Sequence, residues 1–130
     1  MKKLLITLIA ILSLNACVDA TSKEVVTENK PEFRMTYTKD ISEITYCLGM
    51  LFDGFVHGIG VPTTYKVLIA PSGKEGRFSL IRNAQMPLAV YEFKNNEVLL
   101  YPAKGAFAKY VVNSSKTRDM LVNQSKQCIS

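Results

Sequence analysis

The three cysteines constrain this chain more than any other feature, and processing of the N-terminus decides what becomes of Cys17. Lys2 and Lys3 precede an uncharged apolar run over residues 4–14, and Cys17 follows shortly after it. This order is typical of a secretory signal, and the run is too short to span a bilayer as a helix. We therefore predict that residues 1–16 are a signal peptide and that the protein is exported.

The cleavage site has two interpretations. The residues LNAC over 14–17 fit a bacterial lipobox, which predicts cleavage before Cys17 and acylation of its sulfur. Alternatively, an ordinary signal peptidase cleaves after Ala20, with Val18 and Ala20 as the small residues that it recognises. The first cut predicts a lipoprotein on the periplasmic side of the outer membrane, since no Asp directly follows Cys17. The second predicts a soluble periplasmic protein.

Either cut leaves two cysteines in the folded part of the chain, Cys47 and Cys128. In an oxidising compartment pairing is the default, so we predict a disulfide. The alternative is two buried free thiols. A bridge would close a loop of 81 residues (128 minus 47). The chain-entropy model assigns such a crosslink at most about 4 to 5 kcal/mol of stability.

Composition predicts one domain behind a short tether. Residues 17–32 are rich in Thr, Ser, Lys and Glu without hydrophobic periodicity, which is typical of a flexible linker. Residues 33–130 have the length of a single globular domain. Without Lys2 and Lys3 the net charge falls from +5 to +3, and the charges are interspersed. No cluster of basic and aromatic residues indicates a nucleic-acid site.

Apolar residues recur at helical spacing over residues 41–59 and predict a helix with one buried face. Asp40 and Glu43 resemble a capping box at its start. Gly49 and Gly54 lie inside this helix, where each costs about 1 kcal/mol of helix propensity. We therefore expect another helix to approach the glycine face of this helix closely. The stripe is formed by Ile41, Ile44, Leu48, Leu51, Phe52, Phe55 and Ile59.

The middle of the chain is ambiguous between strands and buried helical turns. Apolar runs at 65–70 and 78–81 flank a turn, and the runs 88–93 and 97–102 flank Lys94, Asn95 and Asn96. Further helices are predicted from Pro102 to residue 111 and over residues 116–127. The predicted fold is mainly α, a small helical bundle stapled by one disulfide, with room for one short β-hairpin within 65–101.

The residues give little support for catalysis. His57 lies four residues after Asp53, so the two could meet on one helical face as a general base or as metal ligands. The sequence has no second histidine and no nucleophile motif, and no free cysteine remains once the disulfide forms. A surface ion pair is the stronger interpretation. We predict that the protein is not an enzyme and holds no cofactor or metal.

Two segments resemble a known family. YCLGMLFDGFVHGI (residues 46–59) and FAKYVVNSSKTRD (residues 107–119), followed by a terminal cysteine, are similar to the Rap/Tai immunity proteins. Two of that family's features are missing here: an upstream cysteine, whose absence rules out the family's additional disulfide, and a longer last segment. The matched positions are Tyr46, Cys47, Gly49, Gly54, Tyr110, Arg118 and Cys128.

The resemblance implies a small, exported, helical and often dimeric protein without chemistry of its own. Members bind and block peptidoglycan amidase toxins that type VI secretion delivers to the periplasm. If that holds here, we place the toxin contact on the glycine-rich loop 71–77, with Gly73, Lys74 and Arg77 as contacts, although an ordinary solvent-exposed turn is the alternative. The competing function is an outer-membrane lipoprotein with a structural, partner-binding or surface-exclusion role.

Overall fold

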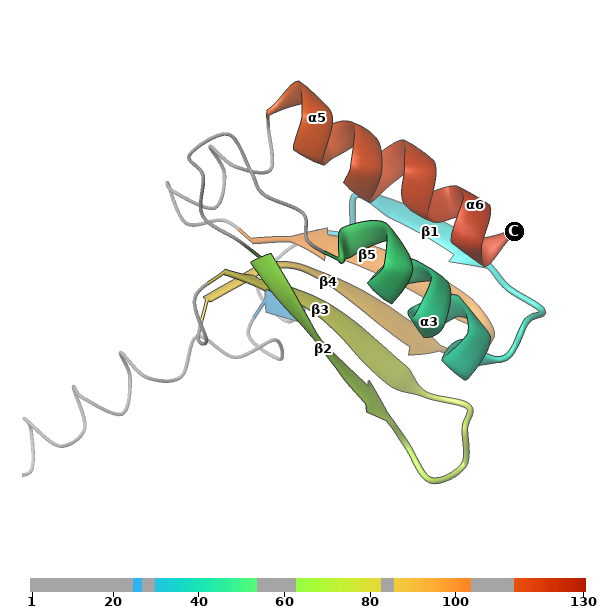
Figure 1. Cartoon of the computed structure of the whole chain (residues 1–130). Helices are drawn as coiled ribbons and strands as arrows, with labels where there is room; N and C mark the ends of the chain where they lie inside the picture. The colour runs from blue at the N-terminus through green and yellow to red at the C-terminus, as the bar shows by residue number, and fades with distance from the viewer. Residues whose placement is uncertain (1–24, 27–29, 54–62, 83–85, 104–113) are drawn as a thin grey trace, which may run out of the picture.

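The structure, a computed structural model, describes residues 25–26, 30–53, 63–82, 86–103 and 114–130. Its centre is a five-stranded antiparallel sheet with the strand order β1-β5-β4-β3-β2 (Figure 1). The sheet therefore has two edges, β1 on one side and β2 on the other. The strands are β1 (Phe33–Thr36), β2 (Thr63–Ile69), β3 (Gly76–Arg82), β4 (Met86–Lys94) and β5 (Glu97–Pro102).

The predicted helical bundle is wrong, because the ambiguous middle of the chain forms most of this sheet. β2, β3, β4 and β5 follow one another as an antiparallel meander, so the region 65–101 holds more than one short hairpin. Pro102 ends strand β5 and does not begin a helix. The rest of the helix predicted up to residue 111 falls within residues 104–113, outside the described part of the chain.

Two turns of the meander were predicted correctly, while the β3–β4 connection at residues 83–85 lies outside the described residues. Asn95 and Asn96 have φ values of 55° and 59° and connect β4 to β5. This is the conformation that a two-residue hairpin turn requires and that Asn tolerates. The β2–β3 turn closes with a hydrogen bond of 2.9 Å from the Ala70 N–H to the Glu75 carbonyl, and Gly73 supplies its positive φ of 71°.

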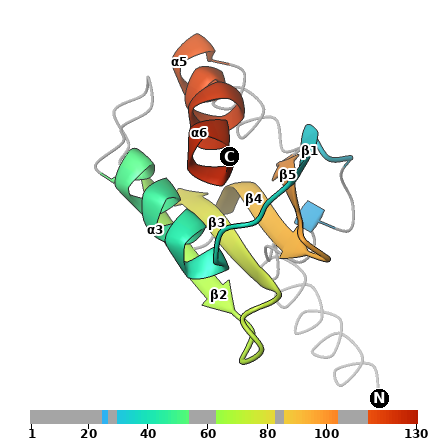
Figure 2. The ribbon, with the colours of Figure 1, turned by 90° about the vertical axis from the view of Figure 1, so that its right-hand side faces the viewer.

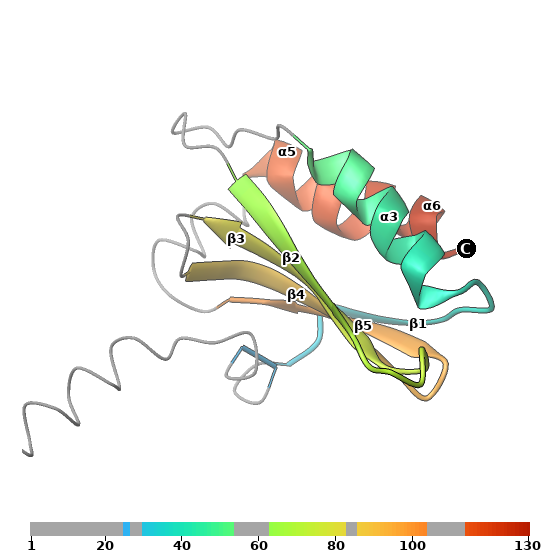
Figure 3. The same ribbon diagram turned by 60° about the horizontal axis from the view of Figure 1, so that its bottom comes forward.

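Two helices cover one face of the sheet (Figures 2 and 3). Helix α3 (Ile41–Phe52) contacts β2 and β3. The second helix, here called the C-terminal helix, consists of α5 (Ser115–Arg118), a π-helical turn η2 (Asp119–Gln124) and α6 (Ser125–Ile129). Both helices were expected from apolar periodicity, but the first was predicted to run to residue 59 and ends at Phe52, since Asp53 is already extended. Phe55 and Ile59 of the predicted stripe lie outside the described residues. The capping box was not confirmed, because the Asp40 side chain makes no cap hydrogen bond.

The core lies between this helical layer and the sheet. Most of the predicted stripe of α3 is buried, although Leu51 is only partly so, and the centroid of the Phe52 ring lies 6.0 Å from that of the Phe78 ring. Under the C-terminal helix, the buried Tyr91 hydroxyl of β4 donates a 2.8 Å hydrogen bond to the Leu121 carbonyl. Burial of such large side chains contributes about 1.5 to 3 kcal/mol each.

The disulfide between Cys47 and Cys128 joins the two helices, with 5.6 Å between the Cα atoms. It links α3, which covers the β2 side of the sheet, to α6, whose Lys126 Nζ lies 5.2 Å from the centre of the Phe33 ring of β1. Within the described residues, no helix is both long and apolar enough to cross a membrane.

Parts of the predicted N-terminal organisation fall outside the described residues. This applies to the signal peptide (1–16), the lipidation site Cys17 and most of the tether (17–32). Segment 25–26, within the predicted tether, lies on the side of the sheet opposite the helices (Figure 3), and Val25 is only 8% exposed. The end of the predicted tether contacts the folded domain, since the Glu32 N–H donates a 2.7 Å hydrogen bond to the Leu100 carbonyl.

Candidate partner-binding site

Three connections meet at one end of the sheet, which we call the hairpin end: residues 36–40, the turn 71–74 and the turn 95–96. Together they line an open groove of about 560 Å³, in which the β1–α3 connection faces Gly73, Lys74 and Asn96. Each connection is held by rigid secondary structure on both sides. Loops that project from a rigid scaffold are common binding elements.

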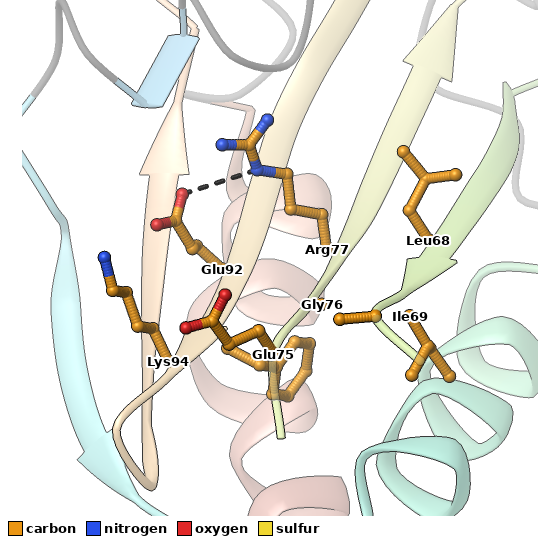
Figure 4. Close-up of a pocket in the computed structure, with 9 residues that line it drawn as sticks. Leu68, Ile69, Glu75, Gly76, Arg77, Glu92 and Lys94 are labelled. Atoms are coloured by element: carbon orange, nitrogen blue, oxygen red, sulfur yellow. Dashed lines mark ion pairs between the residues drawn. The ribbon is translucent and has the colours of Figure 1, made fainter. Parts of the chain in front are cut away.

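A second groove of about 410 Å³ lies on the other side of the β2–β3 turn (Figure 4). It is lined by the ends of β2, β3 and β4, and it contains an ion pair across neighbouring strands. Arg77 Nε lies 3.5 Å from Glu92 Oε2, and the two residues stand opposite each other in the register. That Glu92 oxygen is buried and accepts no hydrogen bond from the described residues.

The structure separates the three residues that were predicted to contact a partner. Gly73 and Lys74 are exposed at the tip of the turn and line the first groove. Arg77 belongs to β3 and lines the second groove, where its side chain is 30% exposed and faces Glu92. The turn therefore exposes Lys74 as its basic side chain, while Arg77 is held in the sheet.

The first groove carries mixed charge and one aromatic hydroxyl. Lys39, Asp40 and Lys74 all line it. Tyr37 also lines it, and its ring packs edge-on against Phe93 at 5.6 Å. Burial raises the pKa of Tyr37 above its ordinary value of 10.0, so its hydroxyl stays protonated to higher pH than that of a free tyrosine. This arrangement suits hydrogen bonding to a polar partner surface.

The described residues do not show the Asp53–His57 pair on which the catalytic hypothesis depends. Asp53 follows α3 and is exposed, whereas His57 lies outside the described residues. Gly54 and Tyr110, two matched positions of the resemblance, also lie outside them. Among the residues that are described, no cluster of three or more His, Cys, Asp and Glu could hold a metal ion.

Sequence reasoning missed a set of exposed apolar side chains at the β2 edge, which we call the edge surface. Tyr65 and Ile69 of β2 lie on the helix side of the sheet, as do Tyr46 and Met50 of α3, whereas Leu68 lies on the opposite face because successive side chains of a strand alternate. Tyr46 is 72% exposed and Met50 62%, the highest values among the large exposed apolar residues of the described chain. Positions 46 and 50 are four apart and therefore share one side of α3. Their signal in the sequence is that both lie off the buried stripe 41, 44, 48 and 52.

Comparisons with known proteins do not place the chain in a family. No protein-family model matches it, and neither a curated protein nor a solved structure is significantly similar to it.

Proposed function

We propose that this protein is a non-catalytic, exported immunity protein that binds and blocks a peptidoglycan amidase toxin delivered by type VI secretion. The observation that carries the proposal is the hairpin end. There, an exposed turn with Lys74 at its tip stands between two open grooves on a disulfide-linked scaffold. Such a projection can fill or cover a cleft in a partner protein. The proposal gives the protein no reaction of its own.

The link to amidase toxins rests on the resemblance of two segments to the Rap/Tai immunity proteins. The disulfide brings these segments together, since Cys47 belongs to the first and Cys128 ends the second. Tyr46, another matched position, is exposed on α3. The sheet-rich fold differs from the helical fold that the resemblance implies, so the toxin class is the part of the proposal that most needs testing.

A second candidate function is a partner-binding or surface-exclusion lipoprotein of the outer membrane. The sheet-rich fold favours it, because this function does not depend on a helical family fold. Both candidates share a location in the envelope. In both, a lipid on Cys17 would hold the protein to the outer membrane, and cleavage after Ala20 would release it into the periplasm.

A protection assay tests the first candidate. A sensitive host directs an amidase toxin, encoded next to this protein, to its periplasm, and lysis is followed with and without the protein. We expect rescue and copurification with the toxin. Lys74→Glu should weaken toxin binding about tenfold or more, because it reverses the charge at the tip of the contact.

The matched control is Lys30→Glu, which makes the same charge change at an exposed lysine outside both grooves. It should protect as well as the unmodified protein. Lysis unaffected by the protein, with every amidase encoded nearby, would contradict immunity and favour the lipoprotein candidate. Rescue that Lys74→Glu leaves unchanged would move the contact away from the hairpin end.

A further inference from the structure

The edge strand β2 is the feature that reaches beyond the proposed function. It pairs with β3 along all seven of its residues, and no strand in the described part of the chain pairs with its other side. Figure 1 shows it at the margin of the sheet. An edge strand presents a row of unpaired N–H and C=O groups, which is a template for another strand.

The register shows which backbone groups face outward. Ala70 donates its N–H to the opposed Glu75, so this pair is hydrogen-bonded. Because hydrogen-bonded and non-hydrogen-bonded pairs alternate in an antiparallel ladder, Leu68 and Lys66 also bond to β3. The N–H and C=O groups of Tyr65, Val67 and Ile69 therefore point away from the sheet.

The side chains around these groups are apolar and accessible. Tyr65 is 44% exposed, Leu68 55% and Ile69 40%. On the helix side, Gly49 lets α3 approach the Tyr65 ring closely, because an added Cβ would lie 2.9 Å from its Cζ and Oη. Tyr46 and Met50 lie on the turns of α3 around Gly49. A strand added beside β2 would meet accessible apolar side chains on both faces of the sheet, Tyr65 and Ile69 on one and Leu68 on the other.

Lys66 decides which kind of strand fits. It is the only charged residue of β2 and the middle one of its seven. Two copies of this protein paired antiparallel along the whole strand would place one Lys66 directly opposite the other, and like charges in that position are destabilising. Registers that avoid this contact shorten the ladder. An acidic residue opposite Lys66 would instead form a favourable cross-strand pair.

We propose that β2 is a docking site for an extended strand of another protein, which pairs antiparallel with it. The strand carries an acidic residue opposite Lys66 and apolar residues opposite Tyr65 and Val67. Lys66 occupies a non-hydrogen-bonded position on the outer side of β2, where opposed side chains come closest. Charge therefore selects the partner, while Tyr65, Val67 and Ile69 supply the backbone hydrogen bonds.

The test uses synthetic peptides with the purified protein. The first probe is Thr-Val-Thr-Val-Glu-Val-Thr-Val-Thr, and the second replaces its central Glu by Lys. We expect the Glu peptide to bind roughly fivefold more tightly, as expected for one opposed charge pair. The Lys66→Glu variant should reverse this preference. A third probe is the Glu peptide with N-methyl groups on the amides that face β2, and it should not bind.

A proline variant separates strand docking from folding. Val67→Pro removes an N–H that points outward, so it spares the hydrogen bonds to β3, and proline is tolerated at such edge positions. We expect it to keep its thermal transition and lose peptide binding. Ile69→Pro makes the same change at a more exposed position and replaces Val67→Pro if that variant unfolds.

Three results would overturn the proposal. The first is equal affinity of wild-type protein for the Glu and Lys peptides, and the second is binding that survives N-methylation. The third is concentration-dependent self-association of the protein that the Val67→Pro variant loses, which would make a second copy the occupant of β2. None of these readouts uses the amidase, so the docking site and the immunity function can fail separately.

Discussion

Strands β1 and β2 lie at opposite edges of the same sheet, but they expose different chemistry. β1 has four residues. The Tyr37 N–H donates a 3.0 Å hydrogen bond to the Asn96 carbonyl, which shows which residues of β1 form hydrogen-bonded pairs with β5. By that alternation, the outward backbone groups of β1 belong to Arg34 and Thr36. Arg34 lies 3.7 Å from Glu97 on the neighbouring strand.

β2 is longer and lacks most of this protection. It has seven residues, exposes three large apolar side chains and carries one charge. Natural proteins protect sheet edges with short strands, charges and prolines, since an open edge invites association. The difference shows that protection is applied edge by edge within one sheet. Within the described part of the chain β2 is the less protected edge, and it is the one we propose to be functional.

The largest expected effect comes from cutting the crosslink between the two halves of the helical layer. Replacing Cys47 and Cys128 together by Ala should lower the free energy of unfolding by about 4 to 5 kcal/mol at most. Urea denaturation of the oxidised protein and the double variant measures this difference. A loss under about 1 kcal/mol would mean that packing alone holds α3 to the C-terminal helix.

The next effect concerns the side of the sheet under the C-terminal helix, where Tyr91→Phe removes the hydrogen bond to Leu121. We expect a loss of about 1 kcal/mol near neutral pH. Burial also raises the pKa of Tyr91 above the ordinary tyrosine value of 10.0. Above pH 10 the unfolded chain binds fewer protons than the folded protein, so stability falls as pH rises.

The Tyr91→Phe variant should lose less stability than wild type between pH 10 and 11, where one such group contributes up to about 1.4 kcal/mol per pH unit. Urea titrations at several pH values measure the slopes. The pKa of Tyr37 is also raised, so the stability of the variant should still fall with pH, but less steeply than that of wild type. Equal slopes in both proteins would contradict the burial of Tyr91.

A cycle of substitutions examines the β2 side. Gly49→Ala would place a methyl group against the Tyr65 ring, which stacks on Phe78 at 5.1 Å. We expect this substitution alone to be neutral or destabilising. Combined with Tyr65→Ala, it should become stabilising by up to about 1 kcal/mol, because the helix propensity of alanine is then gained without a clash. Additive effects of the two substitutions would contradict this contact.

Removing one charge from each edge strand should have the smallest effect on stability. It should also show the difference between the two edges most clearly. Lys66→Leu should leave stability within about 0.5 kcal/mol, as is usual at the surface. It should nevertheless promote self-association, because the opposed charges are lost. Arg34→Leu at β1 is the control and should stay monomeric. Light scattering over a concentration series distinguishes the two variants.

The sequence predicts those parts of the fold whose interacting residues lie close together in the chain. The stripe of α3, the C-terminal helix and the Asn95–Asn96 turn are local patterns, and they were predicted correctly. The sheet was missed for two reasons. β1 pairs with residues more than sixty positions away. β4 is buried on both faces over residues 88–91, so it lacks the alternation that indicates a strand.

The candidate sites follow the same rule. Gly73 and Lys74 were predicted as exposed because a turn signal is local, and both are exposed. Arg77 was assigned to the same loop, but its pairing with β4 places it in the sheet opposite Glu92. The edge surface could not be predicted at all, since an edge exists only once the strand order is known.

Site-resolved hydrogen exchange of the β2 amides would test the open edge itself. If β2 is unpaired on its outer side, the amides of Tyr65, Val67 and Ile69 exchange fast and those of Lys66 and Leu68 slowly. Adding the Glu peptide should then slow the three fast amides and leave the other two unchanged. Slow exchange at all five amides in the free protein would show that the edge is already occupied and would contradict a docking site there.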